Sequence, residues 1–367
     1  MSDLGDLQSS DKDLRREASR IIAERKERGL EGLVGGLQAV IINVEPEKQQ
    51  QSALELMRYS GLDFREAFLG RGSSTIVLRV PGDHKFHSAD FLIRSRMDGK
   101  NPFKDINRAP KSGNLPNTRL ETFVFESHDI EKYFSIQKEA GVKFLGGIQD
   151  AGDYYFLETD PSLWTGNSLG FIQWKGKQRS YITPSSERLE DRPEKPDREH
   201  LKNIRYLDHA ATRVKAQDRD NAILEFMQLT NYNFDFAIYV RSLNSITSVA
   251  RLNPSDFAMV FTSGIAPYAS DEASGPTEKF IRNYGTRVHH IAFQTEQIEN
   301  TCQSLASDGL KFLLDLVGSP EEGLKQIFTE PSKNTLLVTE YIHRYGEFDG
   351  FFARSNVTLL TAATGKQ

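Results

Sequence analysis

The feature that most constrains the fold of this chain is an internal repeat. The stretch TRLETFVFESHDIEKY, which begins at Thr118, can be laid over TRVHHIAFQTEQIENT, which begins at Thr286, with an offset of 168 residues (286 minus 118). The two stretches match in order: a Thr-Arg pair, an alternating strand pattern, a phenylalanine, an isoleucine and a helix. Each half carries strand–helix–strands units twice, so we expect two copies of one architecture.

The boundaries of the two copies follow from composition. The charged stretch at 1–30 predicts a helix that ends at Gly29, and we interpret it as a solvated arm or an oligomer contact. Residues 175–203 contain three prolines and dense charge without an apolar period, which predicts a linker. We therefore expect a first domain at 31–174 and a second domain at 204–367.

Composition also narrows the class of function. A net charge of −5 argues against a surface that binds nucleic acid, and no apolar run reaches the length of a membrane span. We therefore expect neither a nucleic-acid partner nor a membrane partner. The single cysteine, Cys302, fits a reducing compartment, which predicts a cytoplasmic protein, and its helical surroundings indicate a packing residue.

The run at 286–293 alternates like a strand and contains two adjacent histidines, His289 and His290. Alternation sends neighbouring side chains to opposite faces, so only one of them should line a given pocket. A strand histidine is most often a hydrogen-bonded core residue, but His209 and Glu340 lie in strand patterns too. Two histidines and one carboxylate are the facial triad that binds non-haem Fe(II), if a curled sheet brings them together.

The two halves differ at these positions. The repeat puts Thr122 and Ala39 in the places of the two candidate histidines, whereas a carboxylate recurs, with Glu158 expected opposite Glu340. The difference favours one working site, in the second half, and a first half that serves as a structural partner.

The second half resembles the vicinal oxygen chelate superfamily and, more closely, the 4-hydroxyphenylpyruvate dioxygenases. The segments that carry the resemblance are YLDHAATRV, TRVHHIAFQT, DGLKFL, LKQIFTEP and LLVTEYIHR. The first half resembles the family only in architecture. The resemblance implies an α+β fold of tandem βαβββ modules, in which two pseudo-repeated domains each form a curled mixed sheet with outer helices.

Carried over residue by residue, the resemblance implies that His209, His290 and Glu340 bind Fe(II). It also implies two catalytic side chains: Gln326 would hydrogen-bond near the substrate, and Phe328 would stack on the substrate ring. The candidate substrate-binding residues are Ser245, Ser263, His289, Phe351 and Phe352, and Ser248 competes with the first of them for the family's serine motif.

Three departures from the family leave the substrate open. His289 replaces the usual glutamine, FTSG replaces a P-L-N-E segment with Ser263 nearest its asparagine, and the closing-helix signature G-F-G-x-G-N-F appears only as GFFARSN. The implied activity is a dioxygenase of tyrosine catabolism that decarboxylates an aryl α-keto acid with O₂, with a homo-oligomer left open. The alternatives are an extradiol ring-cleaving dioxygenase, which would need a further histidine and tyrosine such as His343 and Tyr341, and a non-catalytic small-molecule binding protein.

Overall fold

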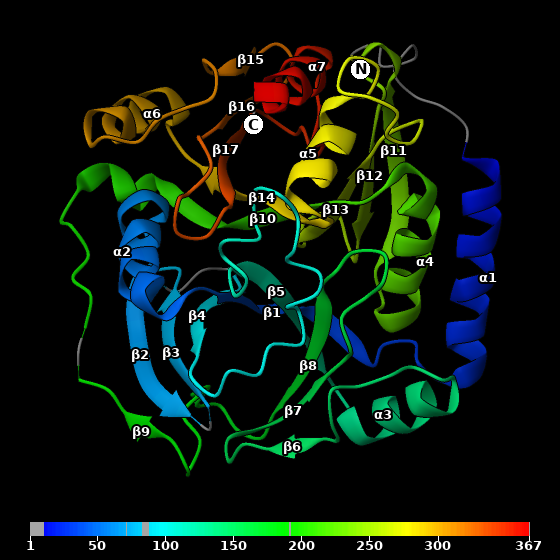
Figure 1. Cartoon of the computed structure of the whole chain (residues 1–367), viewed down its shortest axis with the longest axis vertical. Coiled ribbons are helices and arrows are strands. Elements are labelled where there is room, and N and C mark those ends of the chain that lie inside the picture. Colours follow the sequence, from blue (N-terminus) through cyan, green and yellow to red (C-terminus); the bar gives the residue numbers. More distant parts are fainter. Residues whose placement is uncertain (1–10, 71, 83–87, 191, 367) are drawn as a thin grey trace.

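The computed structural model describes residues 11–70, 72–82, 88–190 and 192–366. An N-terminal helix, α1 (Lys12–Arg28), precedes two halves that lie one above the other in Figure 1. The strands of the first half are β1 (Val34–Asn43), β2 (Asp63–Gly70), β3 (Ser73–Arg79), β4 (Asp90–Arg96), β5 (Arg119–Ser127), β6 (Gln149–Asp150), β7 (Tyr154–Glu158), β8 (Ser168–Trp174) and β9 (Glu187–Arg188). Its helices are η1 (Pro46–Lys48), α2 (Gln49–Ser60), α3 (Ile130–Glu139) and η2 (Glu199–Asn203).

The second half has a corresponding series of strands and additional helices. Its strands are β10 (Ile204–Arg213), β11 (Asn233–Val240), β12 (Ser245–Arg251), β13 (Ala258–Ser263), β14 (Arg287–Thr295), β15 (Val317–Ser319), β16 (Leu324–Phe328) and β17 (Val338–Arg344). Its helices are η3 (Ala216–Asp218), α4 (Arg219–Leu229), η4 (Arg241–Leu243), α5 (Pro276–Tyr284), α6 (Ile298–Ser307), α7 (Arg354–Ala363) and η5 (Thr364–Lys366).

The two sheets share one strand order. The first runs β6-β7-β8-β5-β1-β4-β3-β2-β9, and the second runs β15-β16-β17-β14-β10-β13-β12-β11 when read from the corresponding edge. In each sheet two antiparallel central strands, β1 and β5 or β10 and β14, are flanked by parallel neighbours. Each sheet is thus two βαβββ units joined at the middle, and the predicted α+β fold with two pseudo-repeated halves is confirmed.

Helix α1 is not the solvated arm that its charge suggests. It lies along α4 of the second half (Figure 1) and buries Leu14, Ala18 and Ile21, which recur at helical spacing on one face. The buried guanidinium of Arg25 donates hydrogen bonds to three backbone carbonyls of the second half, those of Met227, Thr230 and Tyr232. The helix ends at Gly29 in the left-handed conformation (φ 72°), as predicted.

Alternating residues of the central strands separate two environments. Val40 and Ile42 of β1 pack into the main core, which also holds side chains of the second half, whereas Ala39 and Ile41 face the inside of the first curl. Aromatic contacts join the halves, for example Phe91 with Phe293, whose ring centroids lie 5.7 Å apart. One core therefore fixes the two curls relative to each other.

The segment 175–203, expected as a linker, lies against the first sheet. Its strand β9 pairs with β2, and Tyr181 is buried inside the first curl. The hydroxyl of Tyr181 lies 3.1 Å from Oδ2 of Asp90, and its ring contacts Trp174 and Tyr154 at centroid distances of 5.3 and 6.0 Å. Aromatic side chains therefore fill the interior of the first curl.

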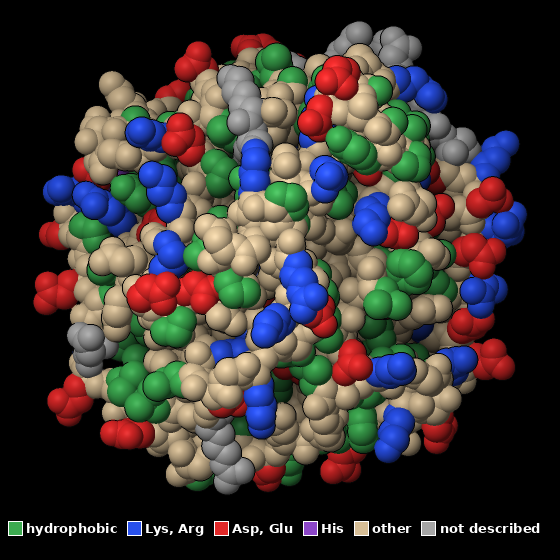
Figure 2. Space-filling view, viewed as in Figure 1, with side chains coloured by type: hydrophobic (Ala, Val, Ile, Leu, Met, Phe, Trp, Pro, Cys, Tyr) green, Lys and Arg blue, Asp and Glu red, His purple; other side chains and the backbone are tan. Residues whose placement is uncertain are grey.

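The surface carries charges of both signs. On the face shown in Figure 2, basic and acidic side chains are interspersed rather than gathered into one patch of a single sign. None of the helices in the described part of the chain is both long enough and apolar enough to cross a membrane.

Candidate metal centre

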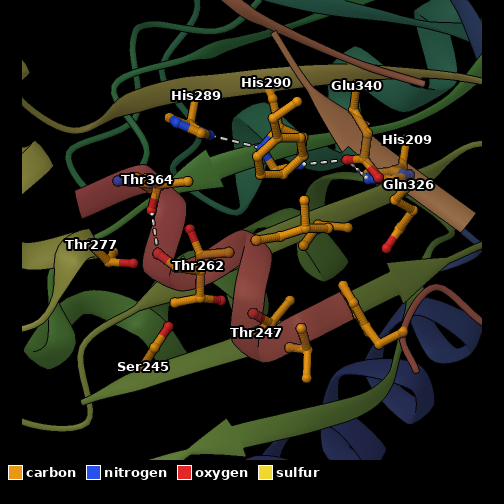
Figure 3. A pocket seen from close by; sticks show the side chains of 17 residues that line it. His209, Ser245, Thr247, Thr262, Thr277, His289, His290, Gln326, Glu340 and Thr364 are labelled. Carbon is orange, nitrogen blue, oxygen red and sulfur yellow. Dashed lines mark hydrogen bonds and ion pairs between the residues drawn. The ribbon is translucent and has the colours of Figure 1, made fainter. Parts of the chain in front are cut away.

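Three side chains from three adjacent strands meet inside the second curl (Figure 3). They are His209 on β10, His290 on β14 and Glu340 on β17. Oε2 of Glu340 lies 3.2 Å from Nε2 of His209 and 3.3 Å from Nε2 of His290. The register explains the convergence, because Ala292 of β14 pairs with both His209 and Glu340, and its small side chain leaves room between them.

The donor set fits a divalent metal ion. One ligand atom from each residue lies within 4.8 Å of the other two, and all three residues are buried. Oε1 of Glu340 is buried and has no hydrogen-bond partner in the described part of the chain, which is costly for a carboxylate unless a cation satisfies it. Two imidazoles and one carboxylate are the ligands of the facial triad that suits Fe(II) and leaves coordination positions open.

A hydrogen-bonded carboxylate and guanidinium orient His209. Its Nδ1 lies 2.8 Å from Oδ1 of Asp208, and Asp208 receives hydrogen bonds from both terminal nitrogens of Arg344. Nε of Arg344 donates to the carbonyl of Gly350 at 2.9 Å. With Nδ1–H directed at Asp208, Nε2 of His209 is the nitrogen available to a metal ion.

In the metal-free site, the pKa values of the two ligand histidines shift in opposite directions. Burial acts to lower the pKa of His209, but Glu340 and Asp208 outweigh it and raise that pKa to about 9. Burial lowers the pKa of His290 well below its ordinary value, and the charges of His289, His209 and Arg213 lower it further. Without a metal ion, therefore, a proton on His209 lies between two carboxylates, in the place where a cation would bind.

His289 lies on the same cavity as His290, so the prediction that only one of them could line a given pocket is wrong. Ala211 pairs with His290 while Thr212 pairs with Val288, which makes His289 the extra residue of a β-bulge. The bulge cancels the alternation, and Nδ1 of His289 lies 2.8 Å from Nδ1 of His290 (Figure 3).

The register also identifies the true counterparts in the first half. Ala39 pairs with Val124 in the first sheet as His209 pairs with Ala292 in the second. Likewise, Thr122 pairs with Ile41 as His290 pairs with Ala211. Both expected replacements of the histidines therefore lie at the predicted positions. The expected match of Glu158 with Glu340 is wrong. Glu158 ends β7, where it pairs with Gly170 as Phe328 pairs with Glu340, so the residue in the place of Glu340 is Gly170.

A cavity adjoins the triad. Helix α7 and the following turn cover it, and its apolar wall consists of Val260, Phe328, Phe352, Val357 and Leu360. Gln326 also lines it and connects β16 to the cover, because its Nε2 donates to the carbonyl of Phe351 at 3.0 Å. Oε1 of Gln326 accepts a hydrogen bond from Asn356 of α7 at 3.0 Å.

The structure brings most of the candidate residues to this cavity. The ring of Phe328 lies 4.8 Å from that of His290, and Ser245 and Phe352 line the wall. Phe351 instead packs its ring edge-on against His209 at 5.5 Å. Ser263 faces away, with its hydroxyl on the carbonyl of Gly264, because alternation along β13 turns Thr262 to the cavity instead.

Several residues of the site were not found from the sequence. Ser248, the competing serine, accepts a hydrogen bond from Arg219 and does not line the cavity. Arg213 lies four residues after His209 on β10 and therefore on the same face, so strand alternation predicts its place on the cavity. The other side chains that were missed lie beside the first ligand or on neighbouring elements of the wall: Asp208, Thr247, Thr262, Thr277, Thr361 and Thr364.

No family model matches the chain, and no curated protein matches it. Among solved structures it is similar to a mutant of 4-hydroxymandelate synthase from Streptomyces coelicolor, with a TM-score of 0.66 and 15% identity over 91% of this chain and 98% of that one. It is also similar to a fusion of a xylose isomerase-like TIM barrel with 4-hydroxyphenylpyruvate dioxygenase, with a TM-score of 0.61 and 15% identity over 91% of this chain and 53% of that longer one. Together with the two curled sheets, these matches show that the chain has the vicinal oxygen chelate fold.

Proposed function

We propose that the protein is a non-haem Fe(II)-dependent dioxygenase that oxidatively decarboxylates an α-keto acid with O₂. The observation that carries the proposal is the buried triad of His209, His290 and Glu340 at the wall of an internal cavity. The names of the two similar structures, 4-hydroxymandelate synthase and 4-hydroxyphenylpyruvate dioxygenase, support the same reaction class. The reaction needs metal ligands with a cavity beside them, and the site has both.

Each residue has a part in this proposal. The triad would hold the metal by one face, and bound Fe(II) would supply open coordination positions and electrons for the reaction of the keto acid with O₂. Asp208 would keep Nε2 of His209 directed at the metal. The ring of Phe328 beside His290 would pack against the substrate, and α7 would exclude water from the cavity.

An extradiol ring-cleaving dioxygenase is the second candidate, because the bulge puts the further histidine that such an enzyme would need on the cavity. The tyrosine considered for this role lies elsewhere: the hydroxyl of Tyr341 donates to the carbonyl of Tyr59, away from the cavity. Nδ1 of His343 lies 2.7 Å from the carbonyl oxygen of Thr295. Since only His289 of the required set lines the cavity, we rank this reaction below keto-acid decarboxylation.

The test is metal reconstitution followed by oxygen uptake. Purified protein is stripped of metal, loaded anaerobically with Fe(II), and mixed with aryl and alkyl α-keto acids and with catechols, while bound iron, O₂ consumption and CO₂ release are measured. We expect stoichiometric iron and uptake with CO₂ release on a keto acid. His290→Ala should lose both, and His343→Ala, which removes a histidine outside the cavity, should lose neither.

The other outcomes identify the alternatives. Oxygen uptake with a catechol and without CO₂ would replace the proposal by ring cleavage. Iron binding without uptake on any compound would leave a small-molecule binding protein, and no metal binding at all would overturn the proposed site.

A further inference from the structure

We infer that the substrate carries a second carboxylate, remote from the keto acid, and that Arg213 binds it at the far end of the cavity. The inference rests on the proposed function and deepens it by naming the class of substrate. It starts from a buried cation that lines the same cavity as the triad.

Arg213 lies on the strand of the first ligand and on the same face of it. Since a strand rises about 3.3 Å per residue, the Cα atoms of His209 and Arg213 are roughly 13 Å apart. Arg213 is 4% exposed, and its guanidinium lies over the ring of Phe280, 4.5 Å from the centroid. The guanidinium donates a long hydrogen bond of 3.3 Å to the carbonyl of Pro276. A ligand held by the triad and long enough to span the cavity would meet this cation with its other end.

No carboxylate of the described residues forms an ion pair with Arg213. Glu278 lies two residues after Pro276, whose carbonyl accepts from Arg213. The carboxylate of Glu278 instead accepts hydrogen bonds from the backbone N–H groups of Ala216 and Gly264, at 2.9 and 3.0 Å. Burial is the cause that lowers the pKa of Arg213 to about 9, and the group stays charged at neutral pH. A buried charge without a counter-charge is costly, so the site is incomplete without an anion.

Hydroxyl groups surround this end of the cavity. Those of Ser245, Thr262, Thr277 and Thr364 are grouped away from Glu340 and Gln326 in Figure 3. Oγ1 of Thr262 is buried and has no hydrogen-bond partner in the described part of the chain. A carboxylate would accept from the guanidinium and from such hydroxyls together, whereas a neutral phenol would leave the positive charge unpaired.

Comparison of the two halves shows that Arg213 occurs only in the half that contains the triad. Asn43 pairs with Arg119 in the first sheet as Arg213 pairs with Arg287 in the second, so Asn43 holds the arginine's place. Its Nδ2 donates to the carbonyl of Asn117 at 2.7 Å. The buried cation therefore occurs in the half that has the metal ligands and is replaced by a neutral amide in the half that lacks them.

Pairs of α-keto acids that differ only in the remote group test the inference. The probes are 2-oxoglutarate against 2-oxopentanoate, 2-oxoadipate against 2-oxohexanoate, and 4-carboxyphenylpyruvate against phenylpyruvate, which vary the span between the two ends. Binding to the anaerobic Fe(II)-loaded protein and to the metal-free protein is measured by calorimetry. At least one dicarboxylate should bind about tenfold or more tightly than its partner, as a charge-assisted hydrogen bond would give.

Variants separate recognition from folding. Arg213→Met should abolish the preference in a protein that still binds iron stoichiometrically, and Arg213→Lys should keep part of the preference. Arg282→Met removes an exposed charge from α5 and should keep all of it. Equal binding within every pair, or a preference that survives in Arg213→Met, would overturn the inference. The pairs are also compared in the metal-free protein. If that protein prefers the dicarboxylate but the Fe(II)-loaded protein consumes no oxygen, the proposed function is overturned while the inference about Arg213 stands.

Discussion

Oδ1 of Asp208 lies 2.8 Å from Nδ1 of His209, although consecutive residues of a strand normally point to opposite faces. The register shows why: Leu207 pairs with Phe293 and His209 with Ala292, so Asp208 is the extra residue of a bulge. The bulge at His289 does the same beside His290. Each candidate ligand histidine is therefore accompanied by a polar neighbour that a regular strand would have turned away.

Replacement of Asp208 by Asn should weaken metal binding about 10- to 100-fold, because the hydrogen bond that fixes the tautomer of His209 loses its charge. The measurement is a competition titration of the metal-free protein with Fe(II) or Co(II), accompanied by a thermal melt to show that the fold is kept. Asp220→Asn, which changes an exposed acid of α4, is the control. An unchanged affinity in Asp208→Asn would mean that the pair does not support the metal site.

Whether Glu340 or Glu158 binds the metal can be tested by replacing each of them with glutamine. Glu340→Gln should abolish stoichiometric metal binding, since a neutral amide is a poor ligand and the histidines alone do not complete the triad. Glu158→Gln should bind metal normally, because Glu158 lies in the first curl and accepts a hydrogen bond from Thr122 there. Metal analysis after dialysis measures both. Loss of metal from Glu158→Gln would show that the first half contributes to the site.

The fold could be predicted because the repeat encodes it twice. The strand and helix patterns of the two copies agree although the first copy lacks the metal ligands, so the architecture can be inferred separately from the chemistry. The triad followed from the resemblance and from strand patterns, since His209, His290 and Glu340 all face the same side of neighbouring strands.

What the sequence could not supply was register. The bulges at Asp208 and His289 exist only as mismatches between paired strands, so alternation along one strand misplaced His289. The match of Glu158 with Glu340 failed for the same reason: Glu158 lies in β7, whereas the strand that corresponds to β17 is the following one, β8. Tyr181 lies in a stretch whose charge and prolines are typical of a linker, and only its burial inside the first curl shows its role.

The metal-free protein should lose stability as the pH rises from about 6.5 to about 9. Glu340 and Asp208 raise the folded-state pKa of His209 to about 9, above its ordinary value of 6.5. The folded state therefore holds the proton more tightly than the unfolded state, and the stabilisation is complete below pH 6.5 and lost as the pH passes 9. It amounts to about 3 kcal/mol.

Urea unfolding across this pH range measures the effect. His209→Gln should show a flatter profile, and saturation with metal should also flatten the profile of the parent protein, because the metal replaces the proton. If the parent and His209→Gln profiles coincide, the proton does not reside on His209.

Tyr181→Ala should reduce the free energy of unfolding by about 3–5 kcal/mol, as expected for the loss of a buried aromatic side chain. The residue fills the first curl against Trp174 and Tyr154, so its removal should leave a cavity there. Metal affinity should not change, since the triad lies in the other curl. Tyr268→Ala, which truncates a partly exposed tyrosine, should cost far less in the same denaturant titration. A small effect of Tyr181→Ala would mean that 175–203 behaves as a linker after all.

Arg213→Met should raise the free energy of unfolding of the ligand-free protein by roughly 1–4 kcal/mol, the gain seen when buried ion pairs are replaced by apolar side chains of similar volume. The reason is that the folded chain buries this cation among hydroxyls and the ring of Phe280, with no ion-pair partner among the carboxylates of the described residues. Denaturant unfolding measures the change, with Arg282→Met as the control that should move stability little. An arginine kept for packing would give the opposite sign, a loss of stability on substitution. A gain of stability together with a loss of dicarboxylate binding would show that the charge is kept for the ligand rather than for the fold.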